Sequence, residues 1–139
     1  MSNIKDNEIL ALVDAAKDGF TKAYAPYSNF HVGAAVLTVN GNIVKGCNVE
    51  NASYGLTVCA ERNCLAQGVI SGEQAFSAIV IYTNQDKLTP PCGACRQVIV
   101  EFLAPEALVM AVNHNNDRKQ WTVNELLPDA FTPKDLLEK

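Results

Sequence analysis

Residues 31–49, HVGAAVLTVNGNIVKGCNV, decide the fold. Two runs rich in apolar and β-branched residues flank the dipeptide Asn40-Gly41. Asn-Gly between such runs is the strongest short-range signal for a tight turn joining two antiparallel strands. The stretch therefore predicts a β-hairpin, and because a lone hairpin is only marginally stable, other elements must pack against it.

The segments on either side of the hairpin predict helices alternating with strands. Before it, apolar residues at helical spacing predict an amphipathic helix over residues 6–24, ended by Pro26. After it, we expect a helix over 58–70, a strand over 78–83, a helix over 93–103, a strand over 107–112, a turn over 113–120, a strand over 121–123, and a terminal helix starting at Thr132-Pro133.

This order predicts an α/β protein. We expect a three-layer α-β-α sandwich built on a mixed five-stranded sheet, and the length of 139 residues suits a single domain over residues 1–139. Two of the expected helices begin with cysteines directly after a loop or strand. In α/β sheets this is the region that tends to hold ligands.

Composition limits the cellular context. With 48% hydrophobic and 19% charged residues, the chain is typical of globular proteins rather than disordered ones. The N-terminal residues MSNIKDNEIL do not resemble a signal peptide, and no apolar run approaches the length of a membrane span, so we expect a cytoplasmic protein without a membrane partner. Five cysteines, an odd number, favour thiols or metal ligands over a disulfide framework.

The charge balance argues against a nucleic-acid partner. Eleven basic and fifteen acidic residues give a net charge of −4, and the lysines and arginines form no cluster. Proteins that bind a phosphate backbone carry a basic patch. A small neutral ligand suits this chain better.

Two cysteine motifs carry the candidate chemistry: Cys59-Ala60-Glu61 and Cys92-Gly93-Ala94-Cys95. Alone, the second motif fits a redox pair, a structural zinc site or part of an active site. Together the motifs bring three thiols and a carboxylate to two helix starts. Three protein ligands leave the fourth tetrahedral position of zinc open, and zinc deaminases combine such a site with a glutamate that is not a ligand.

Five blocks resemble the small cytidine deaminases of nucleoside salvage, in the form that uses three cysteines. The blocks are APYSNFHVGAA, GCNVENASYG, CAERNCLA, PCGACRQV and ELLPDAF. The resemblance covers essentially the whole domain and implies zinc-dependent hydrolytic deamination of cytidine and deoxycytidine to uridine and deoxyuridine, with release of ammonia.

The resemblance also implies roles for single residues. Cys59, Cys92 and Cys95 would bind one Zn²⁺ per subunit, and Glu61 would shuttle protons. Arg62, at a position where the family has an arginine, would donate hydrogen bonds to a zinc-bound thiolate. It would thereby offset the negative charge that three thiolates place on the metal.

The remaining implied positions concern the substrate and the assembly. Asn48 and Glu50 would hold the ribose hydroxyls, and Phe30 would pack against the base or the sugar. The family forms homotetramers, in which Ala52, Tyr54 and Phe131 would reach a neighbouring subunit's site. The expected substrate-binding residues are Phe30, Asn48, Glu50, Ala52, Tyr54, Ala60 and Phe131.

Other functions stay open at this point. One is deamination of another substrate, such as blasticidin S, a nucleotide or a base in RNA. Another is a zinc-stabilised binding module without turnover, and a third is a dithiol oxidoreductase using Cys92 and Cys95. Cys47 and Cys64 have no place in the expected site, and we expect both to be packing residues.

Overall fold

A single mixed sheet forms the centre of the protein. The computed structural model describes residues 4–137, and its five strands lie in the order β2-β1-β3-β4-β5. The strands are β1 (Gly33–Thr38), β2 (Ile43–Cys47), β3 (Phe76–Thr83), β4 (Leu103–Asn113) and β5 (Arg118–Thr122). β3 and β4 are parallel, and the other neighbouring pairs are antiparallel. The predicted hairpin and the mixed five-stranded sheet are both confirmed.

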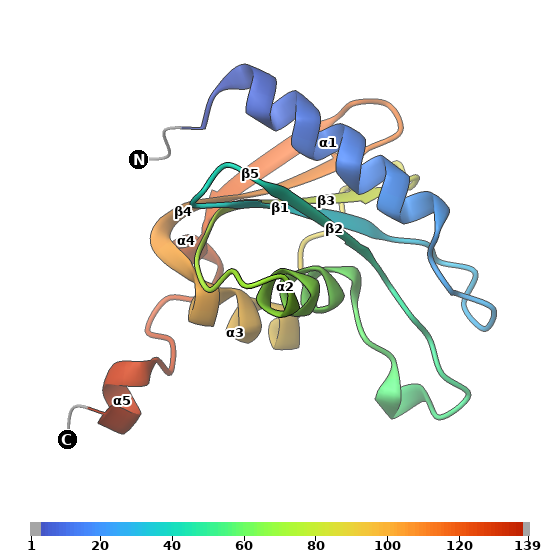
Figure 1. Cartoon of the computed structure of the whole chain (residues 1–139). Helices are drawn as coiled ribbons and strands as arrows, with labels where there is room; N and C mark the ends of the chain where they lie inside the picture. Colours follow the sequence, from blue (N-terminus) through green and yellow to red (C-terminus); the bar gives the residue numbers. More distant parts are fainter. Residues whose placement is uncertain (1–3, 138–139) are drawn as a thin grey trace.

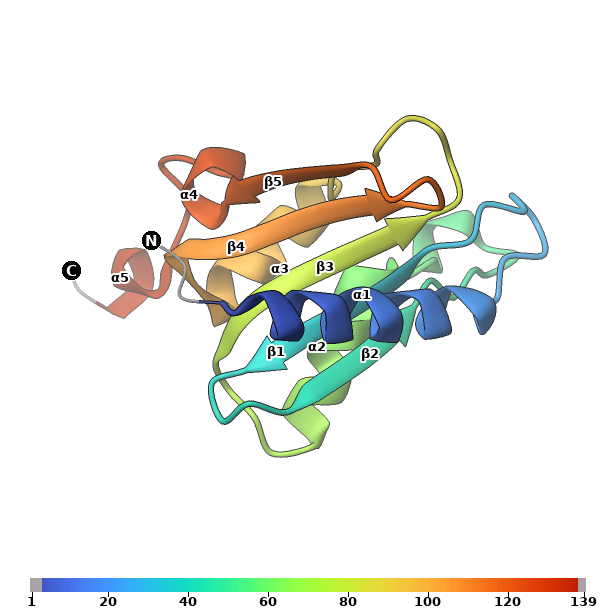
Figure 2. The ribbon, with the colours of Figure 1, turned by 90° about the horizontal axis from the view of Figure 1, so that it is seen from above.

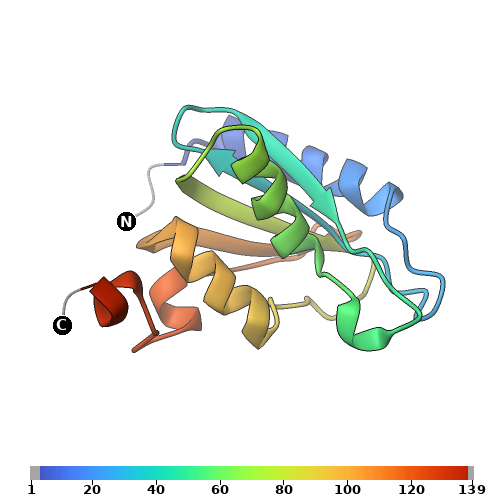
Figure 3. The same cartoon turned by 60° about the horizontal axis from the view of Figure 1, so that its bottom comes forward.

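Helices cover both faces of the sheet. α1 (Asp6–Thr21) lies on one face, whereas α2 (Ala60–Ile70) and α3 (Gly93–Phe102) lie side by side on the other (Figures 1 and 3). Seen from the α1 side, α1 runs over β1 and the strands on either side of it, β2 and β3 (Figure 2). This is the three-layer sandwich that the sequence predicts. Short helices are η1 (Tyr54–Leu56), α4 (Val123–Leu126) and α5 (Pro133–Leu137). Among residues 4–137, none of the helices combines the length and the apolar character that crossing a membrane requires.

Alternate residues of β3 face the two helical layers. Ala78 and Val80 pack in the cluster beneath α1, whereas Ile79 and Ile81 pack with the cluster that includes Leu65 of α2. Because both faces are covered, the strand has a continuous apolar run instead of an alternating pattern.

Some boundaries differ from those expected. β5 begins at Arg118, inside the predicted turn, and Val123 begins α4 instead of ending the strand. The first three residues of β5 are polar and exposed, so its pairing with β4 leaves no apolar pattern to read. Helix α2 begins at Ala60 rather than at residue 58, which makes Cys59 its N-cap.

Gly46 of β2 lets three layers meet backbone to backbone. A Cβ built on Gly46 would lie 2.8 Å from the Cα of Cys64 in α2, and one on Gly19 of α1 would lie 2.3 Å from the carbonyl oxygen of Gly46. Both distances are too short for a side chain. The separation of α2 from the sheet therefore depends on glycine at position 46.

Candidate active site

Three cysteine sulfurs converge where α2 and α3 begin. The Sγ atoms of Cys59, Cys92 and Cys95 all lie within 4.8 Å of one another, and those of Cys59 and Cys92 are 3.9 Å apart. Zn–S bonds of about 2.3 Å in a tetrahedral site place two sulfurs roughly 3.8 Å apart. The donor set and its spacing therefore fit zinc held by three cysteines.

The two helix starts orient these sulfurs. Cys59 and Cys92 are the N-caps of α2 and α3 and have extended backbone angles. At an N-cap the side chain turns toward the free N–H groups of the first turn, and the helix dipole favours negative charge there. The backbone N–H of Cys95 accordingly donates to the Sγ of Cys92 at 3.5 Å.

Arg62 donates a hydrogen bond to the sulfur of Cys59. Its Nη2 donates to the Sγ of Cys59 at 3.5 Å. Hydrogen bonds to that sulfur, first from Cys95 and then from Arg62, lower the pKa of Cys59 to about 5 although burial opposes the shift. The pKa of Cys95 is raised, because its proton is held against Cys59 and because the thiol is buried. A partly buried guanidinium next to the sulfurs suits a cluster that carries negative charge.

Glu61 is the carboxylate of the site. It is only 5% exposed, and burial raises its pKa to about 7, with a further contribution from the nearby charge of Cys59. A carboxyl group that titrates near neutral pH can both accept and donate a proton. Its place two residues after Cys59 puts this group beside the sulfur cluster.

A cavity of about 240 Å³ joins the carboxylate to the cysteines. Of the residues expected at the site, Phe30, Asn48, Glu50, Cys59, Ala60, Glu61 and Cys92 line it. The structure thus brings the candidate acid/base, two candidate metal ligands and four expected substrate contacts to one space. The third candidate ligand, Cys95, is buried next to that space.

Asn48 and Glu50 are held by backbone groups around the cavity. The side chain of Asn48 accepts from the N–H of Val32 at 2.9 Å and donates to the carbonyl of Phe30 at 2.8 Å. The carboxylate of Glu50 accepts from the N–H of Tyr27 at 2.9 Å, and from the N–H and the hydroxyl of Ser28. The Ser28 hydroxyl is the first cause of a lowered pKa for Glu50. Glu50 therefore carries its charge at the rim of the cavity.

Three expected positions lie outside this cavity. Ala52, Tyr54 and Phe131 are not among its lining residues within the described chain, and the residues Tyr54 and Phe131 are 77% and 58% exposed. Tyr54 instead lines a neighbouring pocket of about 390 Å³ together with Tyr27. That pocket shares Glu50 and Thr57 with the cavity, so the two are adjacent.

Five lining residues were not expected: Val32, Thr57, Ile81, Thr89 and Pro90. Val32 and Ile81 have no sequence signal, because an apolar residue in a strand is ordinarily part of the core. Thr89 and Pro90, by contrast, can be found from their position in the sequence. They come shortly before the ligand candidate Cys92, and a loop that delivers a metal ligand also passes the space in front of the metal.

Cys47 and Cys64 stay outside the sulfur cluster. Cys64 is fully buried in the core between α2 and the sheet, and its thiol donates to the carbonyl of Val44 at 3.1 Å. Cys47 is partly buried, and its thiol donates to the carbonyl of Lys22 at 3.5 Å. Among residues 4–137, the group that can hold a metal contains only the other three cysteines, so a fourth sulfur ligand is not at hand.

Comparison with known proteins identifies the family. The family model "Cytidine and deoxycytidylate deaminase zinc-binding region" matches residues 6–112, which include all three clustered cysteines and Glu61. This chain belongs to that family. A cytidine deaminase of Halalkalibacterium halodurans is 46% identical over 114 residues, covering 82% of this chain and 86% of the relative. A cytidine deaminase of Sporosarcina psychrophila is 41% identical over 129 residues, covering 93% of this chain and 95% of the relative.

Solved structures of the family share the fold. The crystal structure of cytidine deaminase from Burkholderia pseudomallei matches with a TM-score of 0.85 at 45% identity, covering 92% of this chain and 100% of that one. The enzyme from Mycobacterium tuberculosis matches with a TM-score of 0.78 at 38% identity, covering 92% of this chain and 98% of that one. The three-layer architecture is therefore that of cytidine deaminases.

Proposed function

We propose that this protein catalyses the zinc-dependent hydrolytic deamination of cytidine and deoxycytidine to uridine and deoxyuridine, with release of ammonia, as a step of pyrimidine salvage in the cytoplasm. The observation that carries the proposal is the buried carboxyl group of Glu61 beside three converging cysteine sulfurs, two of which line the same cavity as Glu61. The family assignment supports it, because relatives covering most of the chain are named cytidine deaminases.

Cys59, Cys92 and Cys95 hold the zinc ion in this proposal. Zinc bound by three protein ligands supplies an activated water as the nucleophile for attack at C4 of the cytosine ring. The positive charge of Arg62, which donates to the Sγ of Cys59, and the two helix starts would offset the negative charge of the three thiolates.

Glu61 moves the protons. It accepts one proton from the attacking water and donates it to ring nitrogen N3. After the attack at C4 it takes the second proton of the former water and donates it to the amino group, which leaves as ammonia. One cytidine and one water are consumed for each uridine and ammonia formed. A pKa near 7, caused by burial, suits a group that must both accept and donate at neutral pH.

Asn48 and Glu50, which line the cavity, would recognise the sugar. Asn48 and Glu50 are fixed by hydrogen bonds to the backbone of residues 27–32, which supports a role in holding the ribose hydroxyls because little reordering would be needed. The negative charge of Glu50 disfavours a phosphate group nearby. Free nucleosides are therefore preferred over nucleotides, with Phe30 and Ala60 as further walls of the substrate space.

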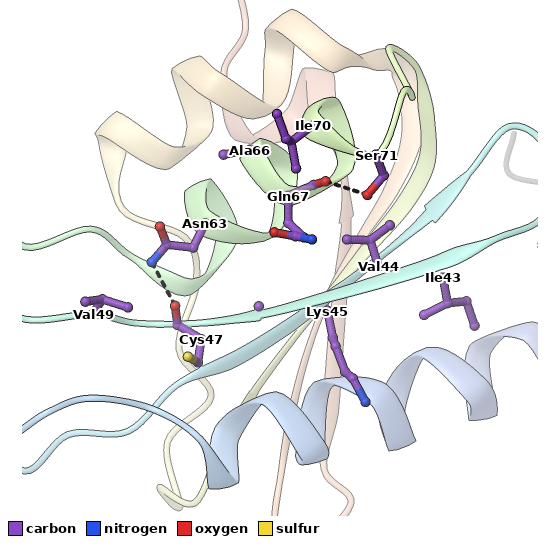
Figure 4. A pocket seen from close by; sticks show the side chains of 11 residues that line it. Ile43, Val44, Lys45, Cys47, Val49, Asn63, Ala66, Gln67, Ile70 and Ser71 are labelled. Atoms are coloured by element: carbon purple, nitrogen blue, oxygen red, sulfur yellow. Dashed lines mark hydrogen bonds between the residues drawn. The ribbon is translucent and has the colours of Figure 1, made fainter.

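We also propose that four copies assemble, so that Ala52, Tyr54 and Phe131 complete a neighbouring subunit's site. Two observations support assembly. Several large apolar side chains outside the cavity are exposed, including those of Tyr54, Phe131 and Ile70. A groove of about 770 Å³ also runs between edge strand β2 and helix α2, and Figure 4 shows its lining by residues such as Val44, Ile70 and Gln67.

Zinc content and turnover measured on one purified sample test the activity. We expect one zinc per chain and release of ammonia from cytidine and deoxycytidine, with slower reaction of their monophosphates and of blasticidin S. A sample that holds one zinc per chain and releases no ammonia from these compounds would reject the proposal in favour of a zinc-stabilised binding module.

Light scattering tests the assembly. We expect about four times the chain mass of 15.0 kDa. A monomer at concentrations where the enzyme is fully active would contradict the shared sites.

A further inference from the structure

Residues 84–91 connect β3 to α3 and form one wall of the cavity. Thr89 and Pro90 of this loop line the cavity, and the loop ends immediately before Cys92. A loop wall can define the shape of a substrate site only if something fixes it. The structure shows hydrogen-bonded attachments near both of its ends, the shortest from Asn113 and Arg96.

The first attachment comes from Asn113, the last residue of β4. Its side chain is only 1% exposed. The Nδ2 group donates to the carbonyl oxygen of Asp86 and to the carboxylate of Asp117, each at 3.1 Å. The Oδ1 atom accepts from the backbone N–H groups of Asn115 and Asp117, each at 3.0 Å. All four hydrogen-bonding positions of the amide are therefore used.

These four bonds divide into two groups. Three of them close the turn between β4 and β5, which joins residues 113 and 117. The fourth, to the carbonyl of Asp86, leaves the turn and reaches the cavity loop. The other three bonds close the turn without this fourth one. The effect of the fourth bond is therefore on the cavity loop. Weaker contacts to the Asp86 side chain come from Asn115 at 3.4 Å and His114 at 3.5 Å, both exposed.

The second attachment comes from Arg96 in α3. Its Nε donates to the carbonyl oxygen of Pro91 at 2.8 Å. The bond lies next to Cys92 and fixes the metal-ligand end of the loop. Residues 87–90, which include Thr89 and Pro90 of the cavity wall, thus lie between the two attachment points at Asp86 and Pro91.

We propose that Asn113 is a positioning residue, which sets the cavity wall at residues 87–90 against the bound nucleoside through its hydrogen bond to the carbonyl of Asp86. The inference rests on the proposed function. Asn113 touches neither the metal ligands nor Glu61, and Arg96 holds the loop next to Cys92. Loss of the bond therefore affects substrate fit more than zinc retention or the chemical step.

Three variants separate the loop bond from the turn. Asn113→Asp keeps the acceptor Oδ1 but removes the donor to Asp86 and places two carboxylates in contact. Asp117→Asn keeps both donor bonds of Asn113 and serves as the matched control. The double variant Asn113→Asp with Asp117→Asn reverses the donor and the acceptor within the turn, so the turn is repaired while the bond to Asp86 stays lost.

For the double variant we expect a Tm above that of Asn113→Asp but below that of the unmodified protein, because a carboxylate replaces the buried amide. We expect full zinc content, an unchanged kcat and a KM for cytidine raised about fivefold, the factor that corresponds to one neutral hydrogen bond. Asn113→Asp should show the same rise in KM with a lowered Tm, and Asp117→Asn should leave KM unchanged. A double variant whose KM returns to that of the unmodified protein would overturn the proposal.

Hydrogen exchange of the amides in residues 84–89 gives a readout that does not depend on turnover. Exchange should accelerate in Asn113→Asp and in the double variant, but not in Asp117→Asn. Unchanged exchange in the double variant would overturn the positioning role. Absence of turnover in the unmodified, zinc-loaded protein would instead reject the proposed function, and the exchange data would still decide the role of Asn113.

Discussion

The starts of α2 and α3 face the same sulfur cluster but differ in what they contribute. The α2 start supplies one cysteine, Cys59, together with the buried Glu61 and with Arg62, which donates to that cysteine's sulfur. The α3 start supplies two cysteines, of which Cys92 is exposed. The candidate acid/base and the arginine that donates to a sulfur thus both lie on α2, whereas α3 contributes two candidate metal ligands, one exposed (Cys92) and one buried (Cys95).

The arginines of the two helices show the same division. Arg62 follows Cys59 by three residues and donates to its sulfur. Arg96 follows Cys92 by four residues and donates to the backbone carbonyls of Pro91 and Leu126. One arginine acts on the charge of the cluster and the other on the position of the chain around it. Arginine near a cysteine ligand does not by itself indicate which task it has.

Glu61→Gln should have the largest effect. Glutamine has nearly the same shape but cannot accept a proton, so we expect kcat to fall by about 10²- to 10⁴-fold. Zinc content, measured by metal analysis, should stay at one per chain. Appreciable deamination by this variant would remove Glu61 from the reaction and weaken the distinction between the helices.

Arg62→Gln should have the next largest effect. Loss of the positive charge beside Cys59 leaves more negative charge on the sulfurs, and we expect a roughly tenfold lower kcat, within the range found for residues that support metal ligands. Assays on protein reloaded with zinc separate this effect from metal loss. Full turnover in the zinc-loaded variant would show that the charge of Arg62 is dispensable.

Arg96→Gln should act on the structure more than on the chemistry. It removes two hydrogen bonds to backbone carbonyls, which corresponds to about 1–3 kcal/mol of unfolding free energy. We expect a lower Tm and faster zinc release to a chelator, with kcat of the zinc-loaded enzyme reduced less than by Arg62→Gln. The reverse order of the two kcat values would contradict the division between the arginines.

The smallest expected effect is the reaction of the Cys64 thiol with a labelling reagent. Burial raises the pKa of Cys64 to about 12, so its thiol stays protonated and unreactive at pH 8. In the folded, zinc-loaded protein we expect mass spectrometry to find Cys64 unmodified by iodoacetamide. Cys47 is partly exposed and serves as the internal comparison. Rapid labelling of Cys64 would contradict the description of α2 as a helix that is packed into the core.

Sequence reasoning succeeded where the signal is local. Asn40-Gly41 specified the hairpin, and the cysteine motifs marked two helix starts that the structure brings together. β5 was partly missed, because its polar residues lie on an edge where pairing with β4 replaces apolar patterning. The roles of Tyr54 and Phe131 stay predictions, because they concern a neighbouring subunit.

Asn113 shows a different limit of the sequence. A polar residue ahead of a turn reads as part of that turn, and three of its four hydrogen bonds do serve the turn. Its remaining bond joins it to Asp86, 27 positions earlier in the chain. Only the parallel pairing of β3 and β4 makes the two residues neighbours, and no local pattern encodes that proximity.

Gly46 restricts how freely this sequence can vary. The residue does not line the cavity, yet even a methyl group there would press on the backbone of α2 at Cys64, between the Glu61 end of that helix and its far end. A side chain at position 46 would therefore displace α2 and, with it, Glu61 in the first turn of that helix, although position 46 has no part in the proposed chemistry.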